Sequence, residues 1–187
     1  VDGTRTVAQC AERHGTRRFV LISTDKAVNP VSVMGKSKRE AEKALMALNA
    51  AKSGTSFCAV RFGNVFGSSG SVVPLFREQI AAGGPVTVTD PAMKRYFMTV
   101  QEAVSLVLQA ASRTERAIYT LEMGEPVGIL KLAEGLIRRA GYRPYKDIPI
   151  VFTGIRPGEK LFEELDVSEK SAFRTDMAKI YITKMEE

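Results

Sequence analysis

Short apolar runs alternate with longer amphipathic segments along this chain, and this alternation limits the possible folds more than any other feature. Strands are predicted at residues 18–23, 55–61, 86–89 (as an exposed strand), 117–121 and 148–152, and helices at residues 3–14, 31–49, 73–82, 99–111 and 129–140. Apolar residues at helical spacing indicate helices, whereas short apolar runs between turn residues indicate strands. Strands that alternate with helices predict an α/β fold in which helical crossovers connect parallel strands.

The composition predicts a globular domain that binds a small anion. Apolar and charged fractions of 44% and 26% are ordinary for such a domain, and no apolar run is long enough to span a membrane. The formal charge of +6 suits an anionic ligand, but the basic residues are scattered, so we expect a phosphate-bearing small molecule and no nucleic acid. We expect no metal site, and we expect Cys10 and Cys58 to be buried thiols.

The segment from residue 20 to residue 38 limits the chemistry. An apolar strand ends in Thr24, Asp25 and Lys26, and the next helix carries Met34 and Lys38 on one face, four residues apart. This is the layout of a Tyr-x-x-x-Lys redox site on a Rossmann-type sheet, with methionine in place of the tyrosine. A thioether cannot give or take a proton. Either the chain does no chemistry, or another group near Met34 moves the proton.

One motif of dinucleotide-binding folds is missing from the start of the chain. Such folds carry a Gly-x-Gly-x-x-Gly loop in their first β-α unit, and none follows an early strand here. The glycine-rich segment 63–70 follows a late strand and has a different spacing, so it does not replace that loop. The sequence therefore predicts the C-terminal part of a larger protein. Residues 1–71 would be the second half of a Rossmann-type NAD(P)-binding domain, and residues 72–187 mainly a small mixed α/β lobe for the substrate, with some segments returning to the sheet.

Five blocks of sequence carry a resemblance to a known family. They are Ser23-Thr-Asp-Lys-Ala-Val-Asn-Pro30, Val33-Met-Gly-Lys-Ser-Lys38, Arg61-Phe-Gly-Asn-Val65, Arg95-Tyr-Phe-Met-Thr99 and Arg156-Pro-Gly-Glu-Lys160. In this order they resemble the bacterial polysaccharide-biosynthesis nucleoside-diphosphate-sugar 4,6-dehydratases of capsular and O-antigen type, in the extended short-chain dehydrogenase/reductase superfamily. The chain is similar to the branch with Met-x-x-x-Lys. Asp90, where histidine is usual, bears on fine substrate preference only.

The resemblance implies an NAD(P)-dependent lyase that converts UDP-N-acetylglucosamine into a 4-keto-6-deoxy sugar nucleotide. Hydride leaves sugar C4, water leaves across C5 and C6, and hydride returns to C6. Thr24 would bond the C4 hydroxyl, Asp25 would protonate the C6 oxygen or serve the C4 hydroxyl, and Lys26 would be the base at C5. Lys38 would hold the nicotinamide ribose, next to Met34. A surface turn pair formed by Asp25 and Lys26 stays open as an alternative.

The same resemblance implies a set of binding residues further along the chain. Near the nicotinamide we expect the backbone of Phe62 and Gly63. The expected substrate contacts are Asn64, Arg95 and Arg156 at the diphosphate, Glu159 at the uridine ribose, and Val88 and Thr89 at the uracil. Arginine suits a diphosphate because its planar guanidinium can bond two phosphate oxygens at once.

Two other functions stay open: a UDP-sugar 4-epimerase and a non-catalytic UDP-sugar-binding module. We expect residues 1–187 alone to be inactive, because the main cofactor-docking half lies outside them. The choice between NAD and NADP, and the group that replaces the tyrosine, stay undecided. The whole protein is expected to form a homo-oligomer in the cytoplasm or at the cytoplasmic face of the inner membrane, where an N-terminal region outside this chain would anchor it.

Overall fold

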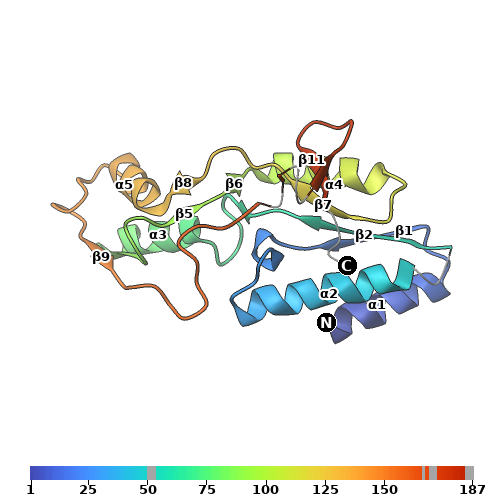
Figure 1. The fold of residues 1–187 in the computed structure, drawn as a ribbon. Coiled ribbons are helices and arrows are strands. Elements are labelled where there is room, and N and C mark those ends of the chain that lie inside the picture. The colour runs from blue at the N-terminus through green and yellow to red at the C-terminus, as the bar shows by residue number, and fades with distance from the viewer. Residues whose placement is uncertain (50–53, 166, 169–171, 184–187) are drawn as a thin grey trace. The chain divides into compact units, whose positions relative to one another are not determined.

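The computed structural model describes residues 1–49, 54–165, 167–168 and 172–183, in which helices and strands alternate (Figure 1). The chain divides into two compact units. The first unit contains Val1–Phe62, Gln101–Met123 and Glu164–Glu187, and the second contains Gly63–Val100 and Gly124–Glu163. The backbone thus leaves the first unit after Phe62 and enters it again twice.

A five-stranded sheet forms the centre of the first unit, in the order β1-β2-β7-β11-β10. Its strands are β1 (Arg18–Ile22), β2 (Ser56–Arg61), β7 (Ile118–Leu121), β11 (Ile180–Thr183) and β10 (Ala172–Arg174). β1, β2 and β7 are parallel, with Val20 opposite Cys58 and Val60 opposite Tyr119. β11 and β10 run antiparallel to their neighbours. The mainly parallel α/β sheet predicted from the sequence is confirmed.

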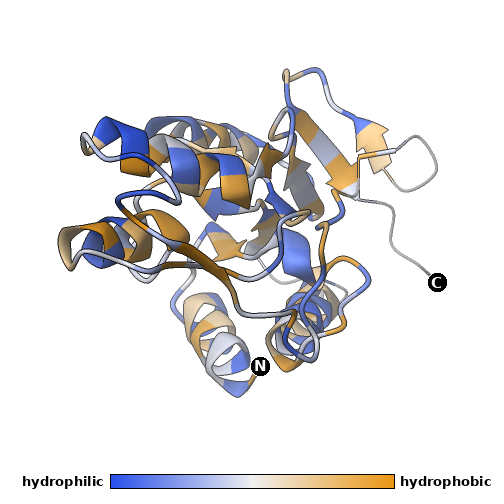
Figure 2. Cartoon of the chain, turned by 90° about the vertical axis from the view of Figure 1, so that its left-hand side faces the viewer, coloured by the Kyte–Doolittle hydropathy of each residue, from blue (hydrophilic) through white to orange (hydrophobic). Residues whose placement is uncertain are grey.

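Helices cover both faces of this sheet (Figure 1). α1 (Asp2–Arg13) and α2 (Val33–Asn49) lie on one face, and α4 (Val100–Ser112) lies on the other. Hydrophobic and hydrophilic segments alternate along the helices (Figure 2), as expected for amphipathic helices that bury one side. Ala8, Leu45, Phe57 and Ile118 meet in the core between α1, α2 and the sheet. The buried apolar faces therefore fix the two N-terminal helices against β2 and β7.

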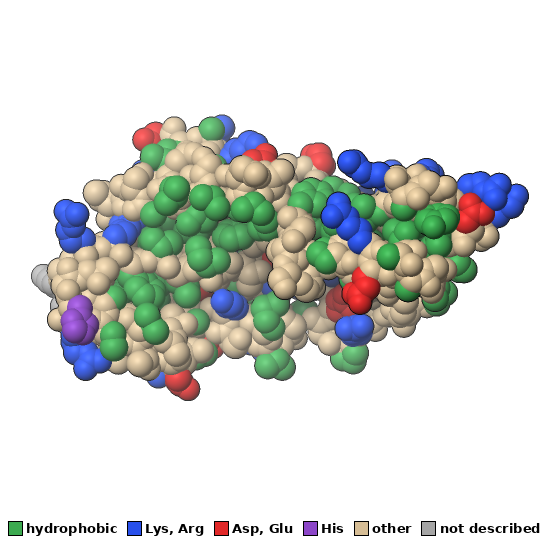
Figure 3. All heavy atoms as spheres, turned by 180° about the vertical axis from the view of Figure 1, so that it is seen from behind, with side chains coloured by type: hydrophobic (Ala, Val, Ile, Leu, Met, Phe, Trp, Pro, Cys, Tyr) green, Lys and Arg blue, Asp and Glu red, His purple; other side chains and the backbone are tan. Residues whose placement is uncertain are grey.

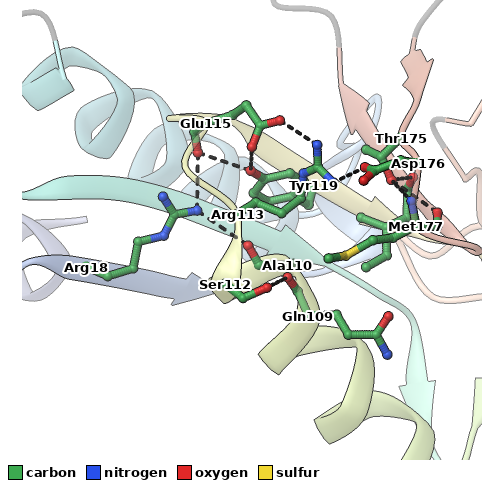
Figure 4. A network of polar contacts seen from close by, with 11 residues as sticks. Arg18, Gln109, Ala110, Ser112, Arg113, Glu115, Tyr119, Thr175, Asp176 and Met177 are labelled. Carbon is green, nitrogen blue, oxygen red and sulfur yellow. Dashed lines mark hydrogen bonds and ion pairs between the residues drawn. The ribbon is translucent and has the colours of Figure 1, made fainter.

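The C-terminal hairpin of β10 and β11 was not predicted, and the expectation that residues 148–152 form the last strand was wrong. A polar network ties the hairpin to the loop before β7 (Figure 4). In it the Arg113 guanidinium pairs with the carboxylates of Glu115 and Asp176. Hydrogen bonds from Arg113 lower the pKa of both carboxyl groups. From β1, Arg18 donates to the carbonyl oxygens of Ala110 and Glu115. This network lies at the amino ends of β1 and β7, which leaves the carboxyl ends for other residues.

The second unit consists of three two-stranded sheets and two helices. The sheets pair β3 (Asn64–Val65) with β6 (Phe97–Met98), β4 (Val86–Val88) with β9 (Ile150–Phe152), and β5 (Lys94–Arg95) with β8 (Val127–Gly128). The helices are α3 (Val72–Ala81) and α5 (Ile129–Arg139). The predicted strand at residues 86–89 is observed as β4, but its predicted exposure was wrong, because Val86 and Val88 face a core with Phe76 and Ile137. The two-residue strands β3, β5, β6 and β8 were not predicted, because two residues are too few to show an alternation of apolar and polar side chains.

A few features bear on location and reactivity. No helix among the described residues is both long and apolar enough to cross a lipid bilayer. Both cysteines are free; Cys58 is fully buried, whereas Cys10 is half-buried. The single histidine, His14, caps the exposed end of α1 (purple in Figure 3).

Candidate functional site

Three polar residues follow the carboxyl end of β1. Thr24 caps a short 3₁₀ helix, η1 (Asp25–Ala27), because its hydroxyl oxygen accepts the Lys26 amide. The Thr24 hydroxyl donates to Asp25 Oδ1 at 2.9 Å, and Lys26 Nζ donates to the same oxygen at 2.9 Å. The Asp25 side chain is fully buried, whereas Lys26 is partly exposed. Asp25 is therefore not one half of a surface turn pair but the buried centre of a three-residue cluster.

The second carboxylate oxygen of Asp25 has different surroundings. Oδ2 is buried and has no hydrogen-bond partner among the described residues. A buried acceptor without a donor costs about 1–3 kcal/mol. The Asp25 amide donates to the Phe62 carbonyl at 3.1 Å, which connects the turn to the end of β2. The cluster thus holds the carboxyl group by its backbone and by one oxygen, and the other oxygen has no donor among the described residues.

Met34 and Lys38 lie on one face of α2, as their spacing predicts. Lys38 Nζ donates to the carbonyl of Ile22, the last residue of β1, at 3.3 Å. Met34 is 47% exposed, so it is not a core methionine. Between them, Gly35 is buried, and a Cβ atom built on it would lie 2.3 Å from the Lys26 carbonyl oxygen. The first turn of α2 therefore approaches the Lys26 backbone more closely than any residue with a side chain would allow.

A buried ion pair supports this region, and the sequence analysis missed it. Arg61 Nε donates to Glu42 Oε1 at 2.9 Å, and an Arg61 terminal nitrogen donates to Glu42 Oε2 at 2.6 Å. The Ser23 hydroxyl donates to Glu42 Oε1. All three residues are buried. The available signal was the position of Glu42 four residues after Lys38, which puts a carboxylate on the helix face that carries the predicted site.

In the second unit, a cavity of about 350 Å³ gathers most of the predicted substrate contacts. Those that line it are Asn64, Thr89, Arg95, Arg156 and Glu159. Ligand cavities in proteins are of this size or larger. The cavity is also lined by Thr87, Phe97 and the start of α3, none of which was predicted to contact the substrate. Residues up to 95 positions apart in the sequence thus share one hollow.

Val88 differs from the rest of the predicted set. Its side chain is 1% exposed and belongs to the hydrophobic core of the second unit. The neighbouring Thr87 and Thr89 line the cavity instead. Because side chains alternate between the two faces of a strand, residues on either side of a core valine point to the opposite face. Val88 therefore supports the cavity wall from behind.

The arginines of the cavity are held differently. Arg95 is buried, and it donates to the carbonyl oxygens of Lys94 and Leu161 at 2.8 and 3.0 Å. The carboxylate of Glu159 lies 3.7 Å from its guanidinium. Arg156 is exposed, and its amide donates to Glu159 Oε2 at 3.3 Å. The Arg95 guanidinium is therefore held in place before a ligand binds, whereas the exposed Arg156 side chain can move toward a ligand.

The predicted residues divide between the two units. Thr24, Asp25, Lys26, Met34, Lys38 and Phe62 belong to the first unit, and Gly63 together with all of the cavity residues belongs to the second. Among the described residues, no three histidine, cysteine or acidic side chains cluster as metal ligands would. The side chains that remain suit proton transfer in one unit and anion binding in the other.

The sequence and the fold of this chain are similar to those of known proteins. The family model described as "Polysaccharide biosynthesis protein" matches residues 1–185. The chain is 58% identical, over 88% of its length, to the probable polysaccharide biosynthesis protein EpsC of Bacillus subtilis (strain 168), of which it spans 27%. It is 37% identical over its whole length to the UDP-glucose 4-epimerase of Rickettsia canadensis (strain McKiel), of which it spans 54%.

Among solved structures, the X-ray structure of Pen from Bacillus thuringiensis is similar to this chain with a TM-score of 0.88 and 32% identity. The match covers 98% of this chain and 58% of Pen. The chain thus spans between 27% and 58% of the length of these proteins. It belongs to the polysaccharide biosynthesis protein family, and its fold is of the Rossmann type.

Proposed function

We propose that this chain supplies the proton-transfer and sugar-nucleotide-binding residues of an NAD(P)-dependent UDP-N-acetylglucosamine 4,6-dehydratase for surface polysaccharide synthesis. The observation that carries the proposal is the buried Asp25 carboxylate, bonded by Lys26 at 2.9 Å through one oxygen and without a hydrogen-bond partner among the described residues at the other. Loss of water across C5 and C6 needs a base at C5 and an acid at the C6 oxygen. A carboxyl group and an amine at one strand end supply both.

The proton balance of the Asp25–Lys26 pair supports this reading. If the ammonium of Lys26 passes one proton along its hydrogen bond to Asp25, the pair becomes a neutral amine and a carboxylic acid. The amine can then take the C5 proton, and the acid can protonate the departing C6 oxygen, so that the carbon–oxygen bond breaks and water leaves. These two transfers restore the ammonium and the carboxylate. The pair thus returns to its starting state without any proton from outside.

The remaining residues of the first unit orient the reactants. The Thr24 hydroxyl, which bonds Asp25 in the structure, can bond the sugar C4 hydroxyl. Bound NAD(P) would supply the acceptor for the C4 hydride and its return to C6. Lys38 fits such a cofactor: its ammonium has three donors, and one bonds the Ile22 carbonyl, which leaves donors for ribose hydroxyls. Met34 contributes no proton, so Thr24, Asp25 and Lys26 are the candidates for the groups that do.

The cavity of the second unit suits the diphosphate and nucleoside of the substrate. Arg95 and Arg156 can bond phosphate oxygens, and the Asn64 amide can donate to the same group. Glu159 can accept from ribose hydroxyls, and Thr89 can bond a base edge. Because Glu159 lies within 4 Å of Arg95, a bound phosphate would replace that weak ion pair with direct hydrogen bonds.

A 4-epimerase is the second candidate, because the curated epimerase relative matches the whole chain. An epimerase oxidises C4 and reduces it from the other side, and it needs no base at C5 and no acid at C6. The buried Asp25–Lys26 pair favours the dehydratase. A non-catalytic binding module would need the cavity alone.

The test uses the natural full-length protein, incubated with UDP-N-acetylglucosamine and NAD⁺ in D₂O. NMR follows the sugar. We expect a 4-keto-6-deoxy sugar with deuterium at C5, and a loss of roughly 10²–10⁴-fold in turnover for Lys26→Gln. The matched control Lys43→Gln, in an exposed ion pair on α2, should keep full activity. A C4-inverted hexose would establish the epimerase instead, and bound but unchanged substrate would establish the binding module. Residues 1–187 alone should give no product in the same assay.

A further inference from the structure

The Glu42 carboxylate is fully buried, and its hydrogen bonds to described residues go to Ser23 and Arg61, which lie next to the proposed catalytic groups in the sequence. Ser23 directly precedes Thr24, and Arg61 directly precedes Phe62, whose carbonyl accepts the Asp25 amide. Glu42 itself follows Lys38 by one helical turn. One carboxylate therefore connects the ends of two strands with the helix that carries Met34 and Lys38.

Stability alone does not explain an ionic group at this position. Burying a charge costs several kcal/mol, and hydrophobic residues of similar volume usually stabilise a core as well as a buried ion pair does. An ion pair of this kind gives geometry instead. The Arg61 guanidinium bonds both oxygens of Glu42 in a planar fork, at 2.9 and 2.6 Å, and such a fork fixes distance and orientation together.

Backbone hydrogen bonds connect the ends of β1 and β2 with η1, the short helix that contains Asp25 and Lys26. The Ser23 amide donates to the Val60 carbonyl at 2.8 Å, and the Asp25 amide donates to the Phe62 carbonyl at 3.1 Å. A shift of Arg61 relative to α2 would therefore carry the Asp25 turn with it. Misplacement of catalytic groups by about 1 Å can cost 10²-fold in rate.

We infer that Glu42 is a positioning residue of the dehydration reaction, an inference that rests on the proposed function. Its two carboxylate oxygens hold the β1 and β2 ends at a fixed distance from α2, so that the Asp25–Lys26 pair stands in register with Lys38. Glu42 touches neither substrate nor cofactor in this role. Replacement of Glu42 should therefore lower the rate of the chemical step and leave substrate binding unchanged, because the proposed substrate contacts, such as Arg95, lie in the second unit.

The first readout is catalysis by the full-length protein. Glu42→Gln has nearly the same shape but turns an amide NH₂ toward Arg61, so we expect kcat to fall about 100-fold with KM unchanged. Glu42→Asp keeps the charge but shortens the side chain, and it should fail to restore kcat. The matched control is Glu40→Gln, the same change in an exposed residue of α2 that pairs with Lys43. If Glu42→Asp restores kcat, charge matters and position does not, and the inference is overturned.

The second readout does not depend on the reaction. In amide hydrogen exchange of the same proteins, Glu42→Gln should speed exchange at Asp25 and Val28, whose amides bond Phe62 and Asp25 carbonyls. Exchange at Ala59 within β2, whose amide bonds the Ala117 carbonyl, should stay slow. A uniform loss of protection would show a purely structural role. Should Glu42→Gln fail to fold, Ser23→Ala removes a single donor and should give the same selective pattern, with a smaller effect.

The two readouts separate the two proposals. A wild-type protein without dehydratase product, but with the selective exchange pattern in Glu42→Gln, would refute the proposed function and leave the positioning geometry intact. Product formation together with an unchanged kcat in a folded Glu42→Gln would refute the positioning role alone.

Discussion

Gly35→Ala is the change for which the structure gives the sharpest expectation. The added Cβ would lie 2.3 Å from the Lys26 carbonyl oxygen, 3.1 Å from Pro30 Cβ and 3.2 Å from Ser32 Oγ, whereas ordinary contact begins at 3.4 Å. The closest atom belongs to the backbone, so no side-chain rotation can relieve the clash. The N-terminal turn of α2 must therefore move away from the Lys26 turn by about 1 Å.

The size of the effect follows from two opposing terms. Overpacking by one methyl group typically costs about 1–3 kcal/mol, and a backbone partner puts this site at the upper end. Alanine in place of glycine in a helix returns about 0.5–1 kcal/mol. We expect a net loss of about 2 kcal/mol in the free energy of unfolding, measured by urea denaturation with circular dichroism. The functional effect should be a lower kcat, because Met34 and Lys38 move relative to Lys26.

A second glycine provides the control. Gly135 lies inside α5, and a Cβ built on it meets nothing within 4 Å. Gly135→Ala should therefore stabilise the protein by about 0.5–1 kcal/mol through helix propensity alone. If Gly35→Ala stabilises the protein as Gly135→Ala does, the close approach of α2 to the Lys26 backbone is refuted.

Two further predictions concern single groups. Burial raises the pKa of the Cys58 thiol, so Cys58 should resist a colorimetric disulfide reagent at pH 8 while half-buried Cys10 reacts; rapid reaction of both thiols in the folded protein would contradict this. Hydrogen bonds from Arg143 lower the pKa of Asp147 to about 2, so the stabilisation that this pair gives is complete above about pH 4 and is lost as the pH falls toward 2. Carbon NMR titration should show the low midpoint in the wild type and a higher midpoint in Arg143→Ala, which loses the guanidinium but keeps the backbone amide that donates to Asp147.

The sequence predicted the long elements of the fold well and the short ones poorly. The predicted helix at residues 31–49 is observed as Val33–Asn49, because its apolar positions recur at helical spacing over many turns. β10 and β11 were not predicted, because each strand is short and β11 pairs with β7, which lies far away in the sequence. The strand at Val86 was assigned to the surface because alternation alone does not tell which face is covered, and α3 and α5 cover this one.

The site shows the same division between local pattern and distant contact. The spacing of Met34 and Lys38 placed both on one face of a helix, since four residues make about one turn. The cavity that gathers Asn64 and Arg156 depends on how separate loops fold together, and only the resemblance to a family indicated it. Glu42 was missed because a glutamate inside a polar helix normally faces solvent; its burial depends on Arg61, which comes from another strand.

Met34 stands where a tyrosine would move a proton, so the decisive question is at which step of the reaction Asp25 acts. One variant can answer it. Asp25→Asn keeps the size of the side chain but removes its proton chemistry, while Lys26 stays beside it. If Asp25 acts in the dehydration step, the variant should still form the C4 ketone, seen by the absorbance of the reduced nicotinamide. Without the Asp25 carboxylate Lys26 keeps its proton, so UDP-N-acetylglucosamine recovered from D₂O should carry no deuterium at C5 and should lose no water. If no reduced nicotinamide forms, Asp25 is required earlier, at the C4 hydroxyl. That result would contradict the proton cycle of the Asp25–Lys26 pair, because Lys26 would then have no ketone-activated C5 proton to remove.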